Sequence, residues 1–204
     1  METSNLFLKD IPLYWTTCEK SKDRHPRINS MLNDIGVSGQ MIEGPITTPY
    51  TIGVAKGYLQ ALRITKPPFT ILEDDATLIN YDYNFNDPIS YPNDADALYL
   101  GTSIYGRLQN KTILNGTISA HYNLKILKIF NMLGFHAVTY FSEKYISHVE
   151  NLLLDFIRNP IGGCDDPIAD SMWRYNVYCL KTPIFYQKDG RSDDATKLPI
   201  NILL

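Results

Sequence analysis

The stretch FTILEDDATL, residues 69–78, takes an apolar run straight into three consecutive acids, Glu73, Asp74 and Asp75. Adjacent carboxylates repel one another, and near an apolar core they are costly unless something positive sits among them. Mg²⁺ and Mn²⁺ are held by one or two carboxylates together with substrate phosphate oxygens. The residue types therefore favour a divalent cation and a phosphate-bearing substrate, with a solvated turn or helix cap as the structural alternative.

Side chains alternate along an extended segment, so Glu73 and Asp75 are expected on one side and Asp74 on the other. At least two different roles follow for the three acids. Among phosphate sites, a Walker A loop and a G-x-G-x-x-G sequence are both missing from the chain, which disfavours an NTPase loop or a Rossmann dinucleotide site.

The scaffold that must position these acids is expected to alternate strands with helices. Amphipathic spacing and end signals predict helices at about 26–35, at about 50–64 and from a Ser142 cap to about Arg158. Strands are expected at 11–18, 69–75, 97–103, 134–142 and in two short segments near the C-terminus, with a polar loop between 103 and 134. This pattern predicts an α/β fold with a largely parallel sheet and ligands at the carboxyl ends of its strands.

Composition limits the remaining choices. The chain has 204 residues, is 44% hydrophobic and carries a formal net charge of −3, which suits a single domain over 1–204 without a global field for polyanions. Three widely spaced cysteines indicate neither a disulfide framework nor a zinc site. Without a signal peptide or an apolar run long enough for a membrane span, the expected location is the cytoplasm.

Several short motifs in order resemble glycosyltransferase family 25, which includes lipooligosaccharide and collagen galactosyltransferases. They are YWTTCEKSKDRHPRINSMLNDIG, TIGVAKGYLQAL, ILEDDA, ALYLG, GFHAVTYFSEKYISHVENLL, and CDDPIADSMW with VYCLKTPIFYQKDGRSD. The resemblance covers roughly residues 11–194. The segment GVAKGY departs from the family pattern, which usually has Cys and Ser-His residues there.

The resemblance implies a GT-A fold, a Rossmann-like α/β sandwich with a central, mostly parallel sheet flanked by helices. It also implies a metal-dependent, inverting transfer of a sugar from a nucleoside-diphosphate sugar to a hydroxyl of a glycan, a protein or a modified nucleic acid. Mn²⁺ or Mg²⁺ would bridge the donor diphosphate and assist the leaving group.

Matching positions imply the site residues. The metal ligands would be Asp75 foremost, with Asp74, Gln187 and Asp193. The donor would be bound by Thr16, Arg24, Arg27, Glu73 and Asp74, the two arginines offering paired donors to phosphate. The base would be Asp165 or Asp166; since Asp166 precedes Pro167 and suits a helix cap, local chemistry favours Asp165. His136 has no second histidine at ligand spacing, so a packed role is expected.

Two other functions use the same residues differently. A metal-dependent phosphate or phosphodiester hydrolase would need the acids but no nucleotide sugar, and would require a second metal cluster that the sequence does not locate. A carbohydrate-binding domain with a degenerate site is disfavoured by the intact Glu-Asp-Asp.

Overall fold

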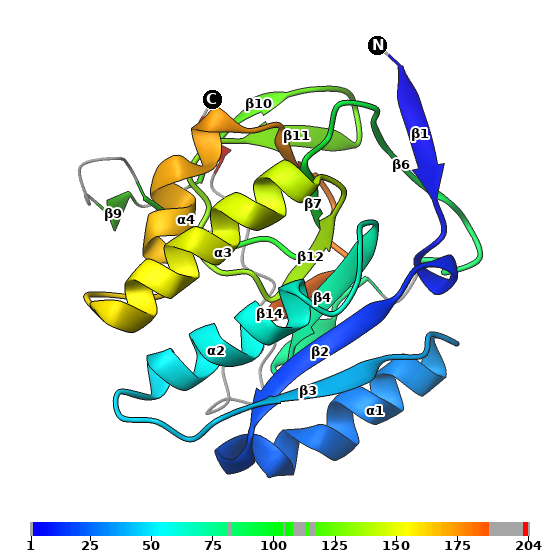
Figure 1. Ribbon diagram of the computed structural model, residues 1–204. Coiled ribbons are helices and arrows are strands. Elements are labelled where there is room, and N and C mark those ends of the chain that lie inside the picture. The colour runs from blue at the N-terminus through cyan, green and yellow to red at the C-terminus, as the bar shows by residue number, and fades with distance from the viewer. Residues whose placement is uncertain are drawn as a thin grey trace.

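A computed structural model describes residues 2–80, 83–103, 105–107, 113–114, 117–187 and 202–203. Within these ranges the main sheet has nine strands in the order β15-β10-β11-β13-β7-β12-β4-β2-β3 (Figure 1). Their bounds in that order are Ile202–Leu203, Thr117–His121, Ile126–Ile129, Val177–Leu180, Ala97–Tyr99, Ala137–Tyr140, Phe69–Glu73, Leu13–Cys18 and Gln40–Gly44.

Most strands of this sheet point the same way. β12 is antiparallel to both of its neighbours, β4 and β7, and β11 is antiparallel to both β10 and β13. The other pairs, β2 with β3, β2 with β4, β7 with β13 and β10 with β15, are parallel. Only β11 and β12 among the nine described strands are therefore reversed, and the expected α/β class with a mostly parallel central sheet is confirmed.

Three described strand pairs lie outside the main sheet. They join β1 (Thr3–Leu6) to β6 (Ile89–Pro92), β14 (Phe185–Gln187) to β5 (Ala76–Leu78), and β8 (Gly106–Arg107) to β9 (Ile113–Leu114). The pair of β14 with β5 matters for the site, because it places Gln187, the last residue of β14, opposite Ala76, which directly follows the acidic triplet.

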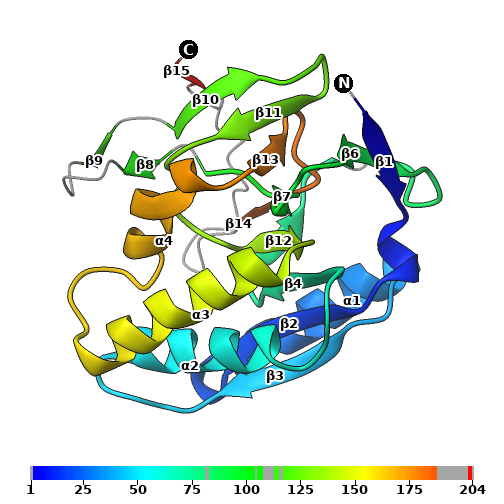
Figure 2. The same cartoon turned by 45° about the horizontal axis from the view of Figure 1, so that its top comes forward.

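Helices cover both faces of the sheet. α2 (Tyr50–Leu62) and α3 (Glu143–Arg158) lie side by side on one face, next to the short α4 (Asp166–Ser171), whereas α1 (His25–Asp34) lies on the other (Figures 1 and 2). Two 3-10 turns, η1 (Leu8–Asp10) and η2 (Glu19–Arg24), flank β2, and a third, η3 (Met172–Arg174), follows α4. No described helix is long and apolar enough to cross a membrane.

The helix signals acted as predicted. Ser142 caps α3, because its Oγ accepts a hydrogen bond of 3.1 Å from the backbone N–H of Tyr145. α1 buries Ile28 and Leu32 on one face, and Gly36 ends it with a φ of 67°, a left-handed conformation that glycine adopts without penalty. The bounds of α2, Tyr50–Leu62, also match the expected helix.

α2 is held against β3 by glycines. A Cβ built on Gly44 would lie 2.6 Å from the carbonyl oxygen of Gly53 and 3.2 Å from the Cα of Gly57. No side chain can occupy that contact without moving the backbone. The glycines of GVAKG, which no sequence pattern explained, therefore set the position of the carboxyl end of β3.

Two expectations about elements were wrong. The segment between 103 and 134, expected to be a polar loop, contains the antiparallel pair β10–β11, which Figure 2 shows at the end of the sheet away from β2 and β3. The buried residues of β10 are the polar Thr117 and Ser119, so no apolar period marks that strand, and β11 is an apolar segment of only four residues. In addition, the N-cap of α4 is Asp165, one residue before the expected cap, and its side chain makes no capping bond.

Candidate functional site

The acidic triplet lies at the carboxyl end of β4, inside the sheet. β4 pairs with β2 on one side and with β12 on the other, and the backbone N–H of Glu73 donates to the carbonyl oxygen of His136 at 3.0 Å. Asp74 and Asp75 then form the turn into β5. Pairing on both sides fixes the strand end, so the three carboxylates have little freedom to move away from one another.

Arg24 supplies the positive charge that Asp74 requires. Its Nη1 lies 2.8 Å from Oδ1 of Asp74, while Thr17 Oγ1 donates to Oδ2 at 2.6 Å. Arg27 donates from Nη2 to the backbone oxygen of Asp74 at 3.1 Å. The Asp74 side chain is 9% exposed, so this network offsets much of the cost of burying its charge.

The segment after β2 positions the two arginines next to the acidic turn. η2 and the first turn of α1 carry both arginines over the end of β4, and neither is a free solvated residue. Arg27 Nε is buried without a hydrogen-bond partner among the described residues. A buried guanidinium N–H without an acceptor is costly, and an anionic ligand would satisfy it.

Asp75 keeps one carboxylate oxygen without a partner. Gln187 Nε2 donates to Oδ2 at 3.1 Å, and Arg24 Nη1 lies 3.6 Å from that same oxygen. The side chain of Asp75 is 14% exposed, and its Oδ1 is buried and has no hydrogen-bond partner in the described part of the chain. The structure thus brings the predicted residues Asp75 and Gln187 together, while Asp193 lies outside the described residues.

Two further carboxylates share the electrostatic environment of Asp75. Burial raises the pKa of Glu73 well above its ordinary value, and the charges of Asp75 and Asp165 raise it further. Burial is also the main cause of the raised pKa of Asp75 and of Asp165. Asp74 contacts Thr17 and Arg24, and Arg24 also lies near Asp75.

The two predicted base candidates have different surroundings. Asp165 Oδ2 accepts from the backbone N–H of Gly134 at 2.7 Å, next to the start of β12. Asp166 pairs with Arg107 of β8, and its Oδ2 accepts from the backbone N–H of Gly163 at 2.8 Å. Asp166 is therefore committed to an ion pair. Sequence reasoning missed Arg107, because no motif surrounds it.

Thr16 does not face an open site. Its side chain is 6% exposed in β2, and its hydroxyl donates to the carbonyl oxygen of Leu72 at 3.3 Å. The expectation that Thr16 binds a donor is corrected by this contact. The next residue, Thr17, is the one whose hydroxyl reaches the acidic turn, because alternate strand residues point to opposite faces.

His136 is packed, as expected. It is 1% exposed, and burial lowers its pKa to about 4. Both ring nitrogens are buried without a hydrogen-bond partner among the described residues. The imidazole is therefore neutral over the physiological range.

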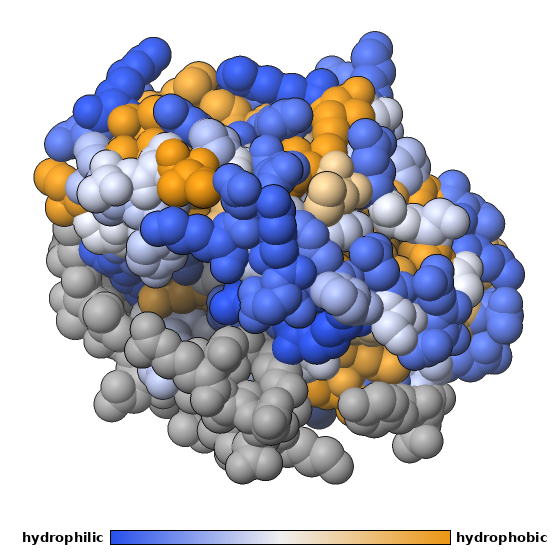
Figure 3. Space-filling view, turned by 90° about the horizontal axis from the view of Figure 1, so that it is seen from below, coloured by the Kyte–Doolittle hydropathy of each residue, from blue (hydrophilic) through white to orange (hydrophobic). Residues whose placement is uncertain are grey.

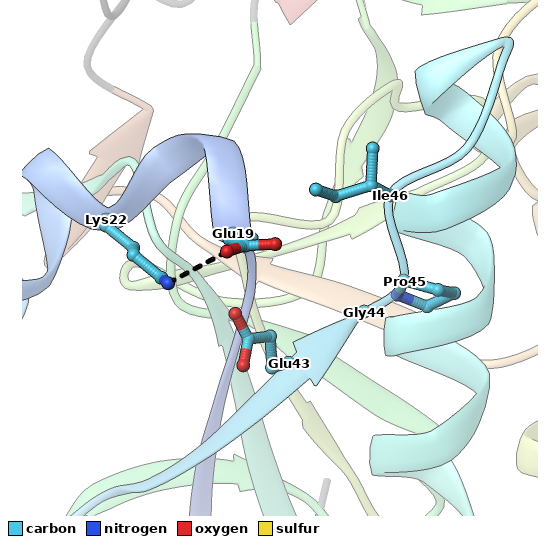
Figure 4. Close-up of a pocket in the computed structure, with 6 residues that line it drawn as sticks. All are labelled: Glu19, Lys22, Glu43, Gly44, Pro45 and Ile46. Atoms are coloured by element: carbon cyan, nitrogen blue, oxygen red, sulfur yellow. Dashed lines mark hydrogen bonds and ion pairs between the residues drawn. The ribbon is translucent and has the colours of Figure 1, made fainter.

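A pocket of about 430 Å³ opens at the ends of β2 and β3. It is lined by Glu19, Lys22, Glu43, Gly44, Pro45 and Ile46 (Figure 4). Seen from below, the side on which η2 and the end of β3 lie, the molecule presents mainly hydrophilic side chains at its centre (Figure 3). The pocket combines three charged residues with the apolar Pro45 and Ile46, and β2 separates β3 from β4 in the sheet.

The residues around the acidic turn offer only part of a divalent-cation site. No group of three or more His, Cys, Asp or Glu side chains arranged to hold a metal occurs in the part of the chain that the structure describes. Mg²⁺ commonly uses only one or two carboxylates and takes its other ligands from water and phosphate. The partnerless oxygen of Asp75 suits that incomplete kind of site, and a closed protein cage is not present among the described residues.

No family model matches the chain, and no curated protein matches it either. Among solved structures, the inositol-1-phosphate CTP transferase from T. maritima is similar at 14% identity and a TM-score of 0.48, over 89% of this chain and 71% of that one.

Two other structures are similar at a comparable level. A nucleoside-diphosphate-sugar pyrophosphorylase from Vibrio cholerae has 9% identity and a TM-score of 0.46, over 85% of this chain and 73% of that chain. The CTP:phosphocholine cytidylyltransferase from Streptococcus pneumoniae has 10% identity and a TM-score of 0.38, over 89% and 76%.

These comparisons correct the expected activity. The three proteins are nucleotidyltransferases, which transfer nucleotidyl groups rather than sugars, so the expectation of glycosyl transfer is wrong. That expectation had come from the resemblance to glycosyltransferase family 25, because carboxylates beside a phosphate by themselves fit several kinds of metal-dependent phosphate chemistry. The resemblance to glycosyltransferase family 25 stays a prediction, since no comparison bears on it.

Proposed function

We propose that this chain is a nucleotidyltransferase that binds a nucleoside triphosphate with Mg²⁺ or Mn²⁺ and transfers the nucleotidyl group to an acceptor oxygen. One observation carries the proposal. Two buried polar atoms of opposite character at the same strand end, Oδ1 of Asp75 and Nε of Arg27, have no hydrogen-bond partner among the residues that the structure describes. A metal-bound phosphate supplies a cation to the first and an anionic oxygen to the second.

The neighbouring groups support the same ligand. Arg24 bridges Asp74 and Asp75, so it lies where further phosphate charge would accumulate. The pocket between η2 and β3 offers room for the nucleoside part, and Lys22 in its lining lies two residues before Arg24 in the chain. The names of the similar solved structures agree with this class of reaction, but the proposal depends on the contacts of this chain's own residues.

In the proposed reaction an acceptor oxygen forms a bond to the α-phosphorus, and the bond from that phosphorus to the bridging oxygen of the leaving group breaks, releasing pyrophosphate. Arg24 and Arg27 would hold the phosphates in line and offset their charge. Asp75 would hold the cation, which supplies charge neutralisation when bound. Asp165, whose pKa is raised by burial, would accept the proton of a hydroxyl acceptor.

The proposal is tested by binding and by turnover. Purified protein is titrated with the four common ribonucleoside triphosphates in Mg²⁺ and in EDTA, using calorimetry and thermal shift. In parallel, pyrophosphate is added to a panel of nucleoside-diphosphate sugars and related nucleoside-diphosphate esters, and nucleoside triphosphate formation is recorded. We expect metal-dependent binding of a nucleoside triphosphate, and its formation from at least one member of the panel.

Asp75→Asn is the informative variant, and Asp155→Asn is its control. Asp155 lies on α3 with a side chain that is 71% exposed, and its ion pair in the described part of the chain is with Arg158. We expect Asp75→Asn to weaken metal-dependent binding by about tenfold or more, the scale of losing a residue that supports a metal site, while Asp155→Asn binds like the original protein. If no triphosphate binds to well-folded protein, or if Asp75→Asn binds unchanged, the proposal is wrong.

A further inference from the structure

The pocket between η2 and β3 has a distinct chemistry. Glu19 and Lys22 come from η2, and Glu43 comes from β3 opposite them. Lys22 Nζ pairs with Glu19 Oε1 at 3.1 Å, and Figure 4 shows both side chains and Glu43 turned toward one another. Glu43 itself makes no hydrogen bond or ion pair within the described part of the chain. The Glu43 carboxylate can therefore accept hydrogen bonds from a ligand in the pocket.

The position of the pocket suits the nucleoside end of a nucleotide. β3, β2 and β4 are consecutive neighbours, with Cys18 opposite Gly44 and Thr16 opposite Glu73. Neighbouring strands are about 4.8 Å apart and the two ends are offset by two residues of about 3.3 Å each, so the ends of β3 and β4 are separated by about 12 Å. A nucleotide whose phosphates lie at Arg24 and Asp75 would extend its base across that distance toward Glu43.

The 3-10 turn η2 would contact both ends of such a ligand. η2 holds Lys22 at the pocket and Arg24 at the acids, two residues apart. Gly44 fixes the strand end next to Glu43, because its backbone packs against Gly53 and Gly57 of α2. The carboxylate of Glu43 therefore projects from a rigid backbone, as a specificity contact requires.

An ionised carboxylate only accepts hydrogen bonds, so it selects a base that donates. Guanine presents two adjacent donors on one edge, N1–H and the 2-amino group, which match the two oxygens of a carboxylate. Adenine and cytosine present one amino group beside a ring acceptor, and uracil places carbonyl oxygens on both sides of its single N–H. The acceptors of these three bases would repel the second oxygen.

We propose that this pocket selects guanine and that Glu43 is the residue that determines the preference. Pro45 and Ile46 supply apolar contact to the face of the base, and Ile46 is 51% exposed without a ligand. This inference rests on the proposed function, since it assigns the base of the nucleotide whose phosphates the acidic turn would bind.

The test compares GTP with ITP, which differs only by lacking the 2-amino group. Affinities of GTP, ITP, ATP, CTP and UTP with Mg²⁺ are measured by calorimetry on the full chain, on Glu43→Gln and on Glu143→Gln. Glu143 is an exposed acid at the start of α3 and serves as the control. We expect GTP to bind tightest, and ITP about tenfold weaker, the scale of a lost charge-assisted hydrogen bond.

Glu43→Gln should reduce the ratio between GTP and ITP to near one and raise UTP affinity, because the glutamine amide no longer repels the uracil carbonyl oxygens and can donate to one of them. Glu143→Gln should keep the original ratio. Equal binding of GTP and ITP, tighter binding of another triphosphate, or an unchanged ratio in Glu43→Gln would overturn the inference and leave the proposed function standing. Absence of binding by every triphosphate would overturn both.

Discussion

Replacing Arg24 by methionine should destabilise the fold through Asp74. Arg24 Nη1 lies 2.8 Å from Asp74 Oδ1 and 3.6 Å from Asp75 Oδ2, so the guanidinium offsets two carboxylates at once. Methionine keeps most of the side-chain volume and removes the charge. Asp74 then retains the hydroxyl of Thr17 as a donor but has lost its only described ion pair.

The expected magnitude follows from how deeply the pair is buried. Breaking a fully buried ion pair costs about 3–5 kcal/mol, and an exposed pair contributes about 0–1 kcal/mol. The Asp74 side chain is 9% exposed and the Arg24 side chain is 30% exposed, which places this pair between the two limits. We expect Arg24→Met to lower the free energy of unfolding by about 2 kcal/mol, the scale of a hydrogen bond to a charged group.

Urea unfolding followed by circular dichroism measures this loss. The control is Arg158→Met, because Arg158 forms an ion pair whose two side chains are 74% and 71% exposed, and it should cost under about 0.5 kcal/mol. In the double variant Arg24→Met with Asp74→Asn, the unpaired charge is absent, so the cost should be about 1–2 kcal/mol less than the sum of the single variants. Additive costs, or an Arg24 effect no larger than that of Arg158, would refute the idea that Arg24 neutralises the acidic turn.

Two further changes test the surroundings of the site. Burial raises the pKa of Glu73 in the folded state, so the folded protein binds more protons than the unfolded chain between the ordinary and the raised pKa, and the free energy of unfolding falls as pH rises through that window. Relative to the original protein, Glu73→Gln should therefore gain stability from pH 4 to pH 8, by about 1.4 kcal/mol per unit of pKa shift. An equal stability difference at both pH values in urea unfolding would contradict this. Gly44→Ala places a Cβ 2.6 Å from the Gly53 carbonyl oxygen and should lower the free energy of unfolding by about 1–3 kcal/mol in the same assay. The control Lys56→Ala, on the exposed side of α2, should change it by under about 0.5 kcal/mol. Equal effects of the two variants would show that the backbone can move apart at Gly44 without a measurable cost.

Local signals in the sequence were sufficient for most of the secondary structure near the site. The Ser142 cap, the apolar period of α1 and the two prolines before β4 each act over a few residues, so they are visible without any tertiary information. The hairpin β10–β11 was not recognisable, because its strands gain their stability from neighbours far away in the sequence, including β13.

The candidate site was only partly predictable for a related reason. An apolar strand that ends in three acids indicates a polar site by local chemistry alone. The family resemblance implied Gln187 as a metal ligand with Asp75, and the structure places the two side chains 3.1 Å apart. The partners of the other carboxylates depend on chain segments that are distant in sequence. Arg24 reaches Asp74 across 50 residues, and Arg107 reaches Asp166 across 59.

The sequence by itself determined the α/β class, the strand that carries the acids and the residue types available for a phosphate and a cation. Only the tertiary structure decided which acid is neutralised by an arginine, which keeps a partnerless oxygen, and that Thr17 rather than Thr16 meets the turn. The physical reason is that a side chain's charge state and free hydrogen-bonding capacity depend on burial and on neighbours brought together by the sheet, and these are properties of the folded arrangement.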